Sequence, residues 1–158
     1  MIPRRGAIVA DITVQDLNDV LEVRQALEEL AVRKACDCAT DEQLKALKQA
    51  ANDFKRCTES EDLLGCVEAD MEFHEIIYDA TGNKRLIQIL NNLREQIYRY
   101  RVEYVRDTGY HGKLLREHDE ITEAILLGDV EKAKAVMHQH IYDQEQIVIQ
   151  NIKQKQDS

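Results

Sequence analysis

Apolar residues recur at intervals of three and four positions from residue 13 almost to the end of the chain. This is the period of amphipathic α-helices, whereas half-buried strands alternate at every second residue. Only one proline and six glycines interrupt regular structure in 158 residues. The pattern predicts six helices, over residues 13–38, 40–60, 63–80, 83–109, 113–127 and from 130 nearly to the C-terminus. Helices joined by such short connections pack as an antiparallel bundle, so we predict an all-α fold.

Residues that cap helices stand at the predicted boundaries. Thr13 is placed to cap the first helix, and Thr40 with Gln43 has the spacing of a capping box at the start of the second. Gly82 follows the third helix and Gly128 the fifth, where glycine readily adopts the left-handed conformation that ends a helix. We therefore expect one helical domain over residues 13–155.

The first twelve residues have a different pattern. Arg4 to Val9 contain a glycine followed by small and β-branched residues, which is typical of a short strand. A lone strand has no partner in a helical protein. We therefore expect residues 1–12 to be an extended segment belonging to an element whose other strands lie elsewhere.

Charge and composition restrict the possible partners. The chain has 21 Lys and Arg against 30 Asp and Glu, a formal net charge of −9, which argues against direct binding to a phosphate backbone. No apolar run approaches the roughly 18–20 residues that span a bilayer, so we expect no membrane partner. The four cysteines form no CxxC pair, and we interpret them as free thiols of a cytoplasmic protein.

Four titratable residues fall on the apolar faces of the predicted helices. They are Asp70, His74, His118 and His140. Asp70 and His74 lie one helical turn apart, so their side chains can converge on one point. A single inward histidine is more often a core residue with a satisfied hydrogen bond. Burying a carboxylate and three imidazoles without partners, however, costs several kcal/mol for each group.

A divalent cation would satisfy all four groups at once. Imidazole nitrogens with one carboxylate oxygen suit Zn²⁺, Ni²⁺, Mn²⁺ or Fe²⁺ better than Ca²⁺ or Mg²⁺, which prefer oxygen ligands. We expect Zn²⁺ first among these. The other histidines do not belong to this group, because His138 falls on a polar face and His111 lies next to two glycines in a predicted loop.

Two arginines are candidates for binding an anionic ligand. Arg24 lies on the inward face of the first helix, where a guanidinium needs an anionic partner such as a carboxylate. The alternative is a structural ion pair with Glu28, and the sequence leaves both open. Arg101 is a second candidate on the fourth predicted helix. Tyr98 and Tyr104 could line the same cavity, although aromatic residues at helical spacing more often belong to the core.

Several residue blocks resemble the FCD domain, the all-helical effector-binding domain of FadR-type GntR transcription regulators. The blocks are Asp70-Met71-Glu72-Phe73-His74, Thr81-Gly82-Asn83, Glu117-His118-Asp119-Glu120-Ile121, Gly128-Asp129 and Met137-His138-Gln139-His140-Ile141. The resemblance extends from about Thr13 to Ile141. It implies that Asp70, His74, His118 and His140 are metal ligands.

The resemblance also implies partners. In that family a winged-helix DNA-binding domain precedes the helical domain, and residues 4–9 resemble the end of its wing. We therefore expect a homodimeric regulator that senses a small carboxylic acid and contacts DNA only through the winged helix. Two alternatives stay open, a small metal-dependent hydrolase-like enzyme and a purely structural metal-binding bundle. No HExxH motif is present, so we expect no catalysis.

Overall fold

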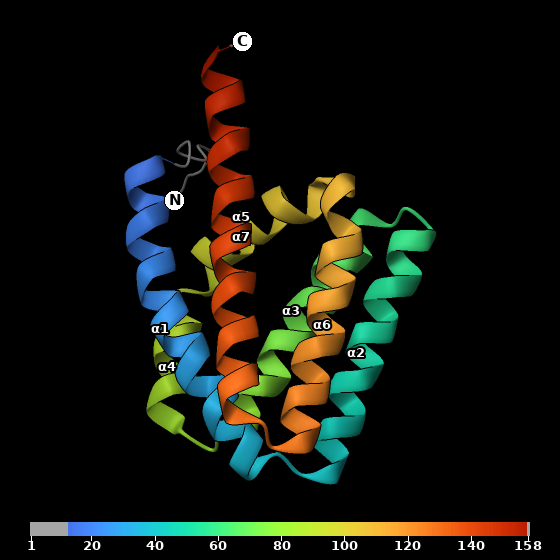
Figure 1. Cartoon of the computed structure of the whole chain (residues 1–158). Helices are drawn as coiled ribbons and strands as arrows, with labels where there is room; N and C mark the ends of the chain where they lie inside the picture. The colour runs from blue at the N-terminus through green and yellow to red at the C-terminus, as the bar shows by residue number, and fades with distance from the viewer. Residues whose placement is uncertain (1–12, 158) are drawn as a thin grey trace, which may run out of the picture.

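The computed structural model describes residues 13–157, and this part of the chain contains seven α-helices, one short 3₁₀ turn and no strand (Figure 1). The elements are α1 (Val14–Cys38), α2 (Asp41–Glu59), α3 (Leu63–Ala80), α4 (Lys84–Asn92), α5 (Arg94–Arg106), η1 (Thr108–Tyr110), α6 (His111–Leu127) and α7 (Val130–Asp157). The predicted all-α class is confirmed. The extended segment predicted for residues 1–12 lies outside the described residues.

The capping residues act as their sequence positions predict. The Thr13 hydroxyl accepts a hydrogen bond from the Asp16 amide, and Thr40 and Gln43 form a reciprocal capping box. Gly128 ends α6 in the left-handed conformation with φ 68°. Glycine adopts this conformation at little energetic cost because it has no Cβ. Local chemistry therefore determines most of the helix boundaries.

The long helix predicted over residues 83–109 is divided in two. The helix ends at Asn92, Leu93 adopts φ −94° and ψ 1°, and α5 begins at Arg94. Asn91 and Asn92 come directly before the break, and asparagine is a poor helix former because its side chain competes for backbone hydrogen bonds. The next helix was also predicted two residues too short, because His111 is the first residue of α6 rather than part of a loop.

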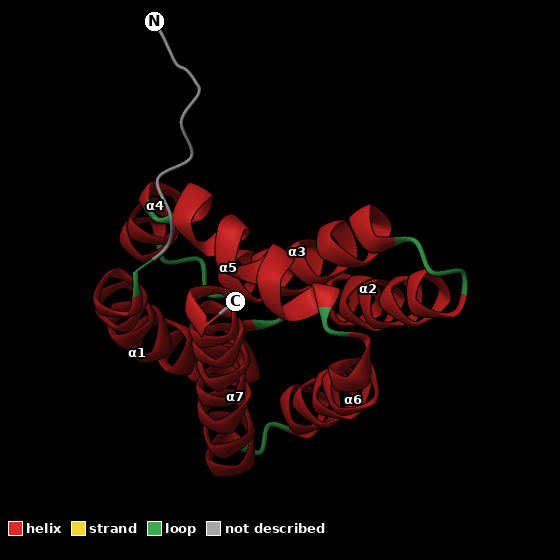
Figure 2. Ribbon diagram, turned by 90° about the horizontal axis from the view of Figure 1, so that it is seen from above, coloured by secondary structure: helices red, strands yellow, loops and turns green. Residues whose placement is uncertain are grey.

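The helices form a closed ring around the middle of the molecule. Seen from above, α1, α7, α6, α2 and α3 follow one another, α3 also packs against α1, and α4 and α5 lie next to α1 and α3 (Figure 2). The most extensive contacts are between α1 and α7 and between α2 and α3. Five of these helices therefore direct one face toward a common centre.

Two hydrophobic clusters fill the interior. One contains Phe73, Ile121 and Met137, and the other contains Phe54 and Leu114, all of them buried. Among residues 13–157, none of the helices combines the length and the apolar character needed to cross a membrane.

Gly128 allows a direct test of the α6 boundary. A Cβ at this position would meet nothing closer than the Cys36 carbonyl oxygen at 3.9 Å, so the cost of Gly128→Ala comes from the positive φ alone. We expect a loss of about 1 kcal/mol in the free energy of unfolding, measured by urea denaturation. Gly112→Ala within α6, where an added Cβ would make only an ordinary contact of 3.6 Å with Arg116 Nη1, should instead stabilise the domain by about 0.5 kcal/mol. Equal effects of the two substitutions would contradict this account of the boundary.

Candidate metal centre

The four inward residues meet in the middle of the ring. Asp70 and His74 come from α3, His118 from α6 and His140 from α7. All four side chains are fully buried, and each offers one potential ligand atom within 4.8 Å of the other three. The i, i+4 spacing on α3 places two of these atoms on one helix face.

The distances between the donor atoms fit a first-row divalent cation. His118 Nε2 lies 2.8 Å from Asp70 Oδ1, and His140 Nε2 lies 3.3 Å from His74 Nε2. His74 Nε2 is 3.9 Å from the same Asp70 oxygen. A tetrahedral cation with bonds of about 2.0–2.1 Å separates its ligand atoms by about 3.4 Å. The four groups are therefore close to the geometry that one ion requires.

Two glutamates orient two of the imidazoles. Glu28 Oε1 is 3.1 Å from Nδ1 of His74, and Glu117 Oε1 is 3.0 Å from Nδ1 of His140. An ionised carboxylate only accepts hydrogen bonds, so both Nδ1 atoms donate, and each Nε2 atom keeps its lone pair. The two Nε2 atoms then lie 3.3 Å apart. Such carboxylate–histidine pairs are the usual outer partners of histidines that bind a metal.

The second oxygen of Asp70 is held by α5. Arg101 Nε donates to Asp70 Oδ2 at 2.7 Å, and the Tyr104 hydroxyl donates to the same atom. Asp70 Oδ1 is thereby left to face the histidines. Arg101 and Tyr104 therefore both contact Asp70, a member of the proposed metal site. Tyr98 is only partly buried and packs against the core.

Arg24 forms the ion pair with Glu28 that the sequence left as an alternative. Its Nε donates to Glu28 Oε2 at 3.0 Å, and its Nη1 donates to Gln144 Oε1 at 2.9 Å. The Tyr78 hydroxyl donates to Glu28 Oε2 at 2.7 Å. Arg24 Nη2 is buried and has no hydrogen-bond partner among the described residues. One donor of the guanidinium therefore stays available although the ion pair is formed.

The charges of the buried carboxylates are stabilised by their neighbours. Burial alone would raise the pKa of Glu28, but His74 and Arg24 outweigh it and hold the pKa at about 2. Burial likewise opposes ionisation of Asp70, yet His118, His74 and Arg101 keep its pKa well below the ordinary value. Burial lowers the pKa of the His74 imidazole, and Glu28 opposes this only in part. At neutral pH the carboxylates are charged and His74 is neutral, which is the form that binds a cation.

Aromatic rings enclose the site on the side of α6. Phe73 stacks on the His118 ring with centroids 4.3 Å apart, and Phe54 meets the same ring edge-on at 4.9 Å. His118 Nδ1 is buried and has no hydrogen-bond partner within residues 13–157. His138, which the sequence placed on a polar face, is exposed and pairs with Glu29.

Several members of this network were not predicted from the sequence. Glu117, Gln144 and Tyr78 were not named as parts of the site. Tyr78 follows His74 by four residues, and Gln144 follows His140 by four. A search for polar residues one helical turn from each inward histidine would have found both.

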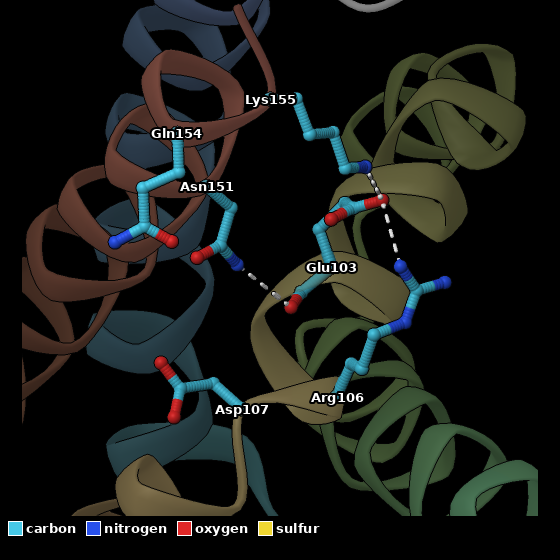
Figure 3. A pocket seen from close by; sticks show the side chains of 6 residues that line it. All are labelled: Glu103, Arg106, Asp107, Asn151, Gln154 and Lys155. Atoms are coloured by element: carbon cyan, nitrogen blue, oxygen red, sulfur yellow. Dashed lines mark hydrogen bonds and ion pairs between the residues drawn. The ribbon is translucent and has the colours of Figure 1, made fainter. Parts of the chain in front are cut away.

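A solvent-exposed pocket lies between the end of α5 and the last turns of α7. Figure 3 shows its lining, in which Glu103 accepts hydrogen bonds from Lys155 at 3.1 Å and, through its backbone oxygen, from Asn151 at 3.4 Å. Arg106 Nη1 is 3.5 Å from the Glu103 carboxylate. These contacts join the two helices at the surface.

Comparison with known proteins agrees with this architecture. Residues 19–143 match the FCD domain family. The chain is 28% identical over 137 residues to the uncharacterized HTH-type transcriptional regulator YdhC of Bacillus subtilis (strain 168), covering 83% of this chain and 59% of YdhC. It is 27% identical over 151 residues to the HTH-type transcriptional repressor GlaR of Escherichia coli (strain K12), covering 89% of this chain and 68% of GlaR. The chain thus spans about three fifths to two thirds of the length of these two relatives.

The fold is shared with a solved structure described as the metal-free FCD domain of TM0439. The TM-score is 0.76 at 20% sequence identity, and the match covers 92% of this chain and 99% of that one. The chain therefore belongs to the FCD domain family of GntR-type transcription regulators, which confirms the resemblance seen in its sequence.

Proposed function

We propose that this chain is the effector-sensing and dimerising domain of a GntR-type regulator, and that it binds a divalent metal and a small carboxylic acid. The observation that carries the proposal is the convergence of one carboxylate and three imidazoles, all fully buried, on one point. The similarity to HTH-type regulators supports a regulatory role. A non-catalytic role follows, with DNA bound through a winged-helix domain of the whole regulator.

The proposed ligands are Asp70, His74, His118 and His140, with Zn²⁺ as the favoured metal and Ni²⁺, Mn²⁺ or Fe²⁺ as further candidates. Nitrogen donors with one carboxylate oxygen match these cations, and the Nε2 atoms of His74 and His140 lie only 3.3 Å apart. A bound cation would supply open coordination positions for an anionic ligand. The name of the relative of known structure, a metal-free FCD domain, is consistent with metal binding in this family.

The proposed carboxylate anchors are Arg24 and Arg101. Arg24 Nη2 is a buried donor that has no partner among the residues the structure describes, and an arginine fork binds a carboxylate well. Arg101 lies beside the proposed cation because its Nε is bonded to Asp70. A carboxylate held by the cation and by Arg24 would connect α1 with α3, α6 and α7.

Zinc binding tests the ligand assignment. We expect one equivalent of Zn²⁺ to bind and to raise the melting temperature, because only the folded chain assembles the four ligands. His74→Ala should weaken binding by at least about 100-fold, more than the loss of an outer partner of a metal ligand. His138→Ala, which changes an exposed histidine, should leave the affinity unchanged. Equal zinc affinities for the wild type and His74→Ala would contradict the assignment.

Acetate, titrated by calorimetry, tests the carboxylate anchor. The zinc-loaded domain should bind acetate, and Arg24→Lys should weaken this binding by about 10-fold, because lysine keeps the charge but loses the planar fork. Arg33→Lys on the exposed face of α1 is the matched control. Acetate binding that is unaffected by Arg24→Lys would remove Arg24 from the site.

Signal transmission through α1 is part of the proposal. The helix carries Arg24 and Glu28 and begins next to the segment that resembles the wing of the DNA-binding domain. We propose that effector binding shifts α1, and thereby the spacing of two DNA-binding heads in a homodimer. A coupling of about 1–3 kcal/mol between the two sites would change operator affinity by about 5- to 150-fold.

Hydrogen exchange tests this route. Adding saturating acetate to the zinc-loaded domain should change amide protection within residues 14–31, while α2, which carries none of the proposed anchors, should change less. Unchanged protection throughout α1, with acetate binding established by calorimetry, would contradict transmission through this helix.

A further inference from the structure

Gln144 connects the proposed metal ligand His140 with the proposed carboxylate anchor Arg24. Its side chain is 1% exposed and lies one helical turn after His140 on α7. One end of the amide is 2.9 Å from Arg24 Nη1, and the other end is 2.9 Å from His140 Nε2. No other side chain in the described part of the chain is hydrogen-bonded to both of these residues.

The chemistry of the neighbours determines how the amide is oriented. A guanidinium only donates, so the end of Gln144 that faces Arg24 is the carbonyl oxygen. The amide nitrogen then faces His140 Nε2. The Nδ1 atom of His140 donates to Glu117, which leaves Nε2 as the acceptor for the Gln144 N–H.

The Nε2 atom of a neutral imidazole has one lone pair in the plane of the ring. That lone pair can accept the Gln144 N–H or bind a cation, but not both. Gln144 must therefore turn away when His140 serves as a metal ligand. Because the amide is a single rigid unit, the same movement withdraws its oxygen from Arg24 Nη1. Arg24 would then have two N–H groups free on one edge, since Nη2 already has no hydrogen-bond partner in the described part of the chain.

We propose that Gln144 is a positioning residue that links metal binding to the exposure of the Arg24 fork. While its amide is hydrogen-bonded to His140 Nε2 and Arg24 Nη1, neither atom is available to a ligand. When the amide turns away, both atoms become available. The inference rests on the proposed function, because it needs a cation at His140. It also predicts an order of events, in which the carboxylate is bound strongly only after the metal.

The test compares zinc and acetate binding by the wild type, Gln144→Leu and Gln139→Leu. Leucine nearly preserves the volume of glutamine but has no hydrogen-bonding group, and Gln139 is an exposed glutamine on the same helix. Gln144→Leu should bind Zn²⁺ about 2- to 12-fold more tightly than the wild type, because one hydrogen bond that competes for Nε2 is gone. Its acetate affinity should also depend less on zinc. Gln139→Leu should behave as the wild type.

A second measurement uses the wild type alone and does not depend on how the variant folds. With glutamine labelled by ¹⁵N, zinc saturation should shift the side-chain amide resonances of Gln144 as they lose His140 Nε2, while those of Gln139 stay in place. Unshifted Gln144 resonances in the zinc-saturated protein would overturn the inference.

The outcomes separate the inference from the proposed function. A wild type that binds no zinc contradicts the proposed function, and the inference falls with it. A wild type that binds zinc, while Gln144→Leu binds it equally or more weakly, overturns the inference alone and leaves the metal site standing.

Discussion

The ionised carboxylate of Asp70 is the group around which this domain is organised. It is fully buried, and its two oxygens contact residues from α5 and α6 as well as its own helix. A buried charge without partners would cost several kcal/mol. The surrounding helices must therefore stay in place to keep Arg101, Tyr104 and His118 against it. The same requirement fixes the positions of the other potential metal ligands, His74 and His140.

Glu28 performs a similar task on the opposite side of the cluster. It accepts hydrogen bonds from Arg24, His74 and Tyr78, which come from α1 and α3. Each of the two buried acids thus orients one histidine. Glu28 is hydrogen-bonded to His74, and Asp70 is hydrogen-bonded to His118. Because every member is hydrogen-bonded to at least one other, a change at one group alters the hydrogen bonds that its neighbours can make.

Much of this arrangement was predictable from the sequence. The helical period places Asp70, His74, His118 and His140 on apolar faces, and sequence signals mark most of the helix ends. The break at Leu93 was missed because the apolar period continues across it, and the change of direction depends on how α5 packs. The partners of the four residues were missed for another reason. Glutamate is common on helix surfaces, so only the packing of α6 against α7 shows that Glu117 is inside.

Helix α7 is continuous for 28 residues, a rod of roughly 42 Å at 1.5 Å per residue. His140 and Gln144 lie near its middle, whereas Val148 and Ile152 bury their side chains in the same hydrophobic cluster as Leu17 near the start of α1. Beyond them, Asn151 and Lys155 are bonded to Glu103 on α5 (Figure 3). A helix without a hinge transmits rotation along its whole length. A small rotation of α7 at His140 would therefore also rotate Ile152, about 18 Å away, at the end of the molecule where α1 begins.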